Sequence, residues 1–167
     1  PVFIGSSRGL FLTEIGTPDV GLAGAGWAAR AQDASTFFKN PAAMSLLDGA
    51  QFQGGAQLLS GDVGFTSNGN STSSGGGGGH PIDVFPGASG FYVHPLGDDW
   101  RVGFGIFSNF GLGLKYTGKG VGRYYLKDAL LAGVSFMTTA SYRVNEYLSV
   151  GGGVNVMLGA VKQTVGI

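Results

Sequence analysis

The sequence predicts an all-β protein that forms a transmembrane antiparallel β-barrel or part of one. First, apolar and polar residues alternate along most of the chain from about residue 50 onward, as in strands with one face toward lipid. Second, only 12% of the 167 residues are charged, about half the proportion usual in soluble domains. Third, no apolar run reaches the roughly 18 residues of a membrane-spanning helix, so spanning strands account better for this composition.

Composition and motif content exclude several function classes. Ten basic and ten acidic residues give a formal net charge of zero, which leaves no basic surface for nucleic acid. The absence of cysteine excludes disulfides, thiol catalysis and cysteine-based zinc sites. His80 and His94 have no carboxylate and nucleophile at a recognisable spacing, and no metal-ligand cluster is visible. We therefore expect neither an enzyme nor a cofactor.

Residues 1–48 differ from the rest of the chain and form the first predicted unit. The stretch from Gly21 to Ala31 is rich in glycine and alanine, and Asp33 or Ser35 is placed to cap a short turn. Its Gly-Ala-Gly pattern resembles a degenerate dinucleotide-binding motif, but no strand precedes it, so we discard that interpretation. We expect a compact, irregular segment that is buried against another part of the molecule.

The tripeptide Asn40-Pro41-Ala42 marks a break within this unit. Proline disfavours the helical conformation at Asn40 and suits the first turn of a short helix over residues 42–47. Residues 1–7 show no signal peptide, which is compatible with a secreted chain that has been processed.

Residues 49–167 form the second predicted unit, with about five strands. We place these strands at about 50–58, 85–95, 100–107, 131–144 and 148–159. The later strands reach about 10 to 14 residues, whereas soluble sheets usually use about 5 to 6 and a bilayer needs about 9 to 11. The connections alternate between long (67–84 and 111–127) and short (97–99 and 145–146). Outer-membrane barrels show this alternation.

Aromatic residues and a glycine tract strengthen the membrane interpretation. Trp100, Tyr142 and Tyr147 lie beside the short turns, where the aromatic girdle of a membrane barrel would be. The tract 67–79 contains serine, asparagine and glycine and ends in five glycines, so it predicts a flexible surface loop.

Several motifs give the chain a resemblance to a known family. They are Gly9–Ile15, Gly21–Gly26, Ala31-Gln32-Asp33-Ala34, Asn40-Pro41-Ala42 before the first long strand, and Ser108-Asn109-Phe110-Gly111-Leu112 after the third. Together they resemble the outer-membrane transporters of long-chain fatty acids and other hydrophobic compounds (FadL/TodX-like) of Gram-negative bacteria. The resemblance implies a barrel of about fourteen strands, plugged by an N-terminal hatch at residues 1–48. Because five strands cannot enclose an occupied lumen, we expect a fragment, a partly described chain or closure by assembly.

The resemblance also implies a ligand path and a gate. The path would contain Leu10, Phe11, Phe107, Ser108, Phe110 and Leu112. Leu10 stands where the family has an aromatic residue, and the Ser108 hydroxyl would lie near the ligand carboxylate. The gate would contain Asn40, Pro41 and Ala42, together with Gly103 and Gly105 in a kinked third strand beside a lateral gap. Glycine inside a strand favours such a bend. Ordinary turn chemistry and packing of the hatch and the barrel wall are the alternatives for these residues.

Cationic side chains in the predicted loop 111–127 have two interpretations. The cations are Lys115, Lys119, Arg123 and Lys127, and they lie among Tyr124, Tyr125 and Leu126. They would either attract a ligand carboxylate or bind phosphates of lipopolysaccharide.

The function that these observations favour is passive transport of hydrophobic compounds across the outer membrane. Fatty acids or aromatic hydrocarbons would be the small-molecule partners, in contact with lipid and lipopolysaccharide, with protein partners if the chain is naturally short. The alternatives are a structural or interaction barrel, such as an adhesin, phage receptor or assembly component, and a general aqueous porin.

Overall fold

The computed structural model describes residues 15–60, 84–115 and 128–164, with the side chains of Asn109 and Leu112 left aside. In these ranges three short helices precede five strands. The helices are η1 (Pro18–Leu22), α1 (Thr36–Lys39) and η2 (Pro41–Leu46). The strands are β1 (Gln51–Leu59), β2 (Phe85–Leu96), β3 (Trp100–Lys115), β4 (Asp128–Arg143) and β5 (Ser149–Thr164). None of the described helices has the length and apolar character needed to cross a membrane.

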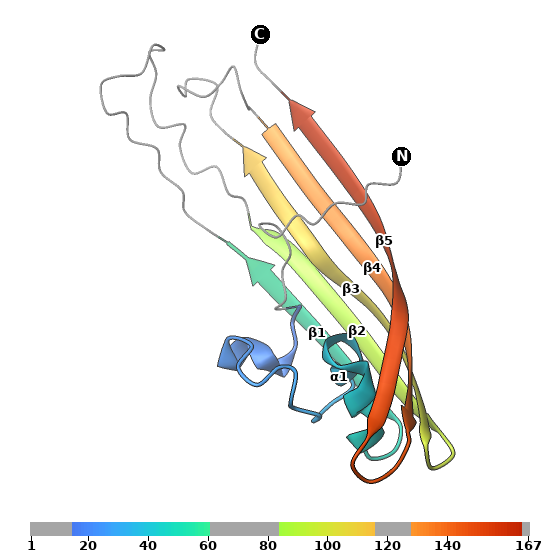
Figure 1. Ribbon diagram of the computed structural model, residues 1–167. Helices are drawn as coiled ribbons and strands as arrows, with labels where there is room; N and C mark the ends of the chain where they lie inside the picture. Colours follow the sequence, from blue (N-terminus) through green and yellow to red (C-terminus); the bar gives the residue numbers. More distant parts are fainter. Residues whose placement is uncertain (1–14, 61–83, 116–127, 165–167) are drawn as a thin grey trace, which may run out of the picture.

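The five strands form one sheet in the order of the sequence, and every neighbouring pair is antiparallel (Figure 1). The predicted all-β antiparallel class is therefore confirmed. Three strands have 16 residues, which exceeds the about 9 to 11 needed to cross a bilayer at a tilt. Two strand ends were predicted about five residues or more too early, because residues 111–115 belong to β3 and not to a loop, and β5 continues to Thr164. β3 continues there because it pairs with β4, although Gly111 and Gly113 make the alternating pattern hard to recognise in the sequence.

The two faces of the sheet differ in what they contact. Side chains alternate along each strand, and one face carries large apolar residues that remain exposed. These residues include Phe52, Leu58, Tyr92, Trp100, Phe104, Ile106, Val134, Phe136, Val154, Val156 and Leu158. An exposed apolar band of this extent is unusual for a sheet in water and suits a face that contacts lipid. We call this face the outer face and the opposite one the inner face.

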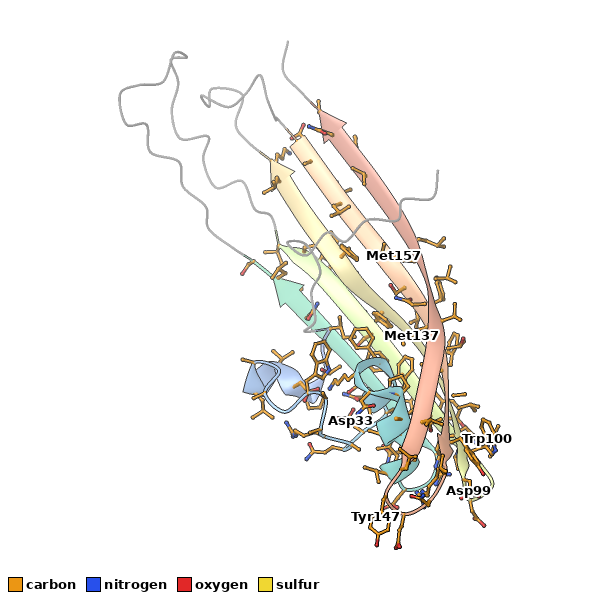
Figure 2. The ribbon with its side chains drawn as sticks, in the orientation of Figure 1. Asp33, Asp99, Trp100, Met137, Tyr147 and Met157 are labelled. Carbon is orange, nitrogen blue, oxygen red and sulfur yellow. The ribbon has the colours of Figure 1, made fainter. Side chains whose placement is uncertain are left out.

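Two short turns close one end of the sheet. Gly97 adopts a φ of 74° in the turn between β2 and β3, and the Asn145 side chain accepts the backbone N–H groups of Tyr147 and Leu148 between β4 and β5. The rings of Trp100 and Tyr142 lie 4.8 Å apart on neighbouring strands, and Trp100 and Tyr147 lie at the same end of the sheet in Figure 2. The structure thus gathers the predicted girdle residues beside the short turns.

Residues 15–50, here called the N-terminal segment, lie along one side of the sheet near the short turns (Figure 1). Apart from its short helices the segment consists of turns and bends. Of the two predicted caps, Asp33 is the one that acts, because its Oδ1 accepts the backbone N–H of Ser35 at 2.8 Å. This contact fixes the chain just before α1.

Candidate functional site

An aromatic cluster joins the N-terminal segment to the inner face of the sheet. Phe37 of α1 lies 5.5 Å from Phe91 of β2, and Phe38 lies 4.7 Å from Phe107 of β3, measured between ring centroids. Phe37, Phe91 and Phe107 are at most 1% exposed, and Met44 of η2 is fully buried with them. Aromatic pairs at this spacing add about 0.5–1.5 kcal/mol to the burial of their area. Among the described residues, this cluster is the only extensive hydrophobic core.

Glycines in β3 make room for the cluster. A Cβ atom on Gly105 would stand 2.6 Å from Cε1 of Phe37 and 2.9 Å from Cδ1 of Phe91. A Cβ atom on Gly103 would stand 2.8 Å from Cβ of Phe37 and 3.0 Å from the sulfur of Met44. Carbon atoms normally pack at about 3.5–4.0 Å, so only glycine fits at both positions.

No bulge lies at Gly103 or Gly105. Both residues pair in register with β2 and with β4. The irregularity lies further along, between Phe107 and Phe110, where the register of β3 against β4 shifts. Glycine is needed at these two positions because Phe37 and Met44 pack directly on them, and not because β3 bends there.

The Asn40-Pro41-Ala42 turn is held on both sides. The side-chain amide of Asn40 donates to the carbonyl oxygen of Ala28 at 2.8 Å. The backbone carbonyl of Asn40 accepts the N–H of Ala43. Pro41 occupies the first position of η2, as expected from its fixed φ. A Cβ atom on Gly151 of β5 would come 2.6 Å from the carbonyl carbon of Pro41. The backbone of this turn therefore rests directly on the sheet.

Polar contacts tie the same region to the β4–β5 hairpin. The guanidinium of Arg143 donates to the carbonyl oxygen of Ser45, and the hydroxyl of Ser45 lies 2.8 Å from that of Ser149. The Thr139 hydroxyl approaches the sulfur of Met44 at 3.5 Å. Three contacts from two strands thus converge on η2.

Charged groups inside the N-terminal segment form a second polar cluster. The ammonium group of Lys39 contacts the carboxylate of Asp19, and Arg30 lies 3.6 Å from the other oxygen of that carboxylate. The Lys39 side chain is only 6% exposed. Loss of water around it lowers the pKa of Lys39 from 10.5 to about 8, even beside a carboxylate. Burial therefore lets this lysine lose its proton at a lower pH than a free lysine, although it stays mostly charged at pH 7.

The sheet is interrupted between β2 and β3. The β1–β2 ladder runs to Leu59 and Phe85, and the β3–β4 ladder runs to Lys115 and Asp128. The β2–β3 ladder stops earlier, at Ser89 and Phe107, although both strands continue within the described residues. The two strands therefore separate over the half of β3 that follows Phe107.

Ser108 lies at the point of separation. Its hydroxyl donates to the carbonyl oxygen of Gly133 on β4 at 3.1 Å, which stabilises the irregular stretch of β3. It also lines a narrow crevice between residues of β1, β2 and β3 that has no room for a water molecule. The lining is formed by Gln57, Leu59, Phe85, Gly87, Ser108 and Gly111.

The remaining predicted site residues are only partly brought together. Leu10, Phe11, Lys119, Arg123 and Lys127 lie outside the described residues, and so does the glycine tract 67–79. Phe107 belongs to the buried cluster, and Phe110 packs near Gly133 on the same inner face. Leu112 pairs with Leu131 through its backbone, and Lys115 ends β3 in an exposed position.

Sequence reasoning missed Phe85, although a signal was present. Pro86 follows it inside β2, and proline in a sheet is confined to edges, strand starts and bulges because it lacks an N–H. This proline indicated that the start of β2 lacks a neighbour on one side.

Long antiparallel strands, an apolar outer face, short turns at one end and a segment packed on the inner face define the wall of an outer-membrane β-barrel. The chain belongs to the outer membrane protein transport protein family (OMPP1/FadL/TodX), whose sequence pattern matches residues 3–166. Its family is thus one of transport proteins in the bacterial outer membrane and not of enzymes. The resemblance inferred from the motifs is confirmed.

Individual relatives agree with this assignment. The chain is 35% identical over 160 residues to outer membrane protein P1 of Haemophilus influenzae, covering 87% of this chain and 35% of that protein. It is 28% identical over 159 residues to the long-chain fatty acid transport protein of Escherichia coli K12, covering 93% of this chain and 35% of that protein. The chain thus spans about a third of the length of these relatives.

A solved structure shows the same fold. The crystal structure of a Pseudomonas aeruginosa FadL homologue superposes with a TM-score of 0.72 at 22% identity. The match covers 91% of this chain and 38% of that one.

Proposed function

We propose that the protein carrying this chain moves hydrophobic compounds, such as long-chain fatty acids, passively across the outer membrane. In this proposal residues 1–48 act as a hatch, and residues 49–167 supply the first strands of the barrel. The separation of β2 from β3 is the lateral exit, through which an apolar molecule passes from the inner face into the lipid.

The observation that carries the proposal is the early end of the β2–β3 ladder. Backbone N–H and C=O groups without partners are costly in lipid, so a closed barrel wall avoids such an interruption. Here both neighbouring ladders continue past the point where this one stops. A wall that is opened at one place supports a passage for molecules that leave sideways.

The inner face near this opening suits apolar cargo. Phe91 and Phe107 are covered by the N-terminal segment, whereas Phe110, beside Gly133 and closer to the opening, is only partly buried. Burial of apolar area contributes about 25 cal/mol per Å², which is enough to hold an acyl chain without many polar contacts. For a carboxylate headgroup we propose Lys115 at the exposed end of β3, because the Ser108 hydroxyl already donates its hydrogen to Gly133.

The gate in this proposal is the Asn40-Pro41-Ala42 turn. Its backbone rests on β5 and its side-chain contacts return to the N-terminal segment, so a shift of the segment would move the turn and the inner face together. No source of chemical energy is needed if the compound follows its gradient.

Uptake of radiolabelled oleate tests the proposal. The full-length gene would be expressed in a strain that lacks its own fatty acid transporter, beside an empty-vector strain. We expect faster initial uptake with the gene, at equal amounts of protein in the outer membrane. Uptake equal to that of the empty-vector strain would exclude this substrate class. Liposome swelling with sugars separates the proposal from a general porin, which alone would admit them.

A further inference from the structure

Beyond the end of the β2–β3 ladder, a phenylalanine ring on β2 lies against a glycine on β3. Residues Phe85 to Ala88 pair with β1 only, so the start of β2 lacks a ladder partner on its other side among the described residues. Across the separation, β3 places Gly111 in a buried position. A bridge between the two strands at this level must come from side chains.

Phe85 forms that bridge. A Cβ atom built on Gly111 would overlap the Phe85 ring at Cε1 and Cδ1 and would lie 2.9 Å from Cζ. The ring therefore occupies the place where a side chain of residue 111 would stand. Any residue other than glycine at position 111 would have to move the ring.

The Phe85 ring is only partly buried, so its open side is the direction in which it can move. The crevice on its other side, lined by Gln57, Leu59 and Gly87 as well as by Ser108 and Gly111, has no room for a water molecule. The hydroxyl of Ser108 is bonded to the β4 backbone, which keeps β3 in place while the ring moves.

We propose that Phe85 is the side-chain gate of the lateral exit. Its ring closes the space between β2 and β3 by lying over Gly111, and it swings aside when an apolar chain passes. The combined size of residues 85 and 111 then sets the width of the exit, and a single acyl chain fits better than a fused-ring compound. This inference rests on the proposed function, which supplies the passage that the ring closes.

A double-mutant cycle on oleate uptake tests the gate. Phe85→Ala removes the ring, and we expect initial uptake to rise roughly three- to tenfold, since the contacts of a single ring hold the closed form. Gly111→Ala displaces the ring and should raise uptake in the same direction. The double variant should equal Phe85→Ala alone, because no ring is left to displace. The matched control is Phe52→Ala, which removes an equal ring from the outer face of β1, where Phe52 is 76% exposed, and should leave uptake unchanged.

The outcomes separate two failures. Wild-type uptake above the empty-vector strain, with both single variants at the wild-type rate, would overturn the gate and leave the proposed function intact. Effects of the two substitutions that add independently would overturn it as well. Wild-type uptake no faster than the empty-vector strain would overturn the proposed function and the gate with it. Uptake rates are normalised to the amount of folded protein in the outer membrane. If Phe85→Ala does not assemble, Gly111→Ala alone still tests the gate.

Discussion

Substituting Gly105 by alanine should loosen the N-terminal segment from the inner face. The added Cβ atom would stand 2.6 Å from Cε1 of Phe37, closer still to its Cζ, and 2.9 Å from Cδ1 of Phe91, about 1 Å inside normal carbon contact. Both rings are at most 1% exposed, so neither has free space to enter. Overpacking of this kind costs about 1–3 kcal/mol. Because β3 stays folded when the segment leaves it, we expect docking of the segment to weaken by about this amount.

Hydrogen–deuterium exchange on the detergent-solubilised protein measures this loss. Amides of residues 15–48 should exchange faster in Gly105→Ala, by roughly tenfold for about 1.4 kcal/mol, while those of β3 keep their protection. Gly113→Ala is the matched control, because Gly113 lies on the same strand and a Cβ atom there would meet nothing within 4 Å. Equal exchange of the segment in both variants would refute the argument that Gly105 exists to admit Phe37.

Three further predictions concern the same contacts. Phe37→Ala should destabilise docking by about 3–5 kcal/mol, seen as faster proteolysis of the N-terminal segment than in the wild type. Equal proteolysis of the two proteins would mean that the segment is not docked in the wild type. Ser108→Ala should cost about 1 kcal/mol and speed amide exchange at residues 107–110 alone; unchanged exchange there would contradict the bond to Gly133. Because the native pKa of Lys39 is about 8 and the unfolded value is 10.5, the native chain loses this proton first, so thermal stability should rise between these pH values. Lys39→Gln should remove that rise.

Much of the sheet was predictable because its strands follow a two-residue period. Phe52, Phe104 and Val154 belong to alternating patterns that identify the outer face without knowledge of their partners. The short turns were equally visible, since Gly97 and Asn145 are residue types that suit tight turns. Local signals of this kind need no information about distant parts of the chain.

Features that depend on distant partners were not predictable in the same way. The extension of β3 through Gly111 to Lys115 follows from pairing with β4, and the glycine-rich pattern there suggests a loop when read alone. Gly103 and Gly105 were assigned to a bend because glycine has that effect in isolation, whereas their neighbours Phe37 and Met44 lie some 60 residues earlier. The ladder interruption carried one local sign, Pro86, which becomes informative only beside the register of β3.

The link between η2 and the β4–β5 hairpin has a consequence for assembly. Arg143 and Ser149 contact Ser45 across 98 and 104 residues of sequence. Ser45 is synthesised first, but its partners exist only when the hairpin has formed, and contacts of such long range form late in folding. The N-terminal segment must therefore wait without these partners while the strands insert. A chain whose insertion stalls before β5 would leave η2 without its contacts to Ser149 and Gly151, so the segment would be held by its packing on the earlier strands alone.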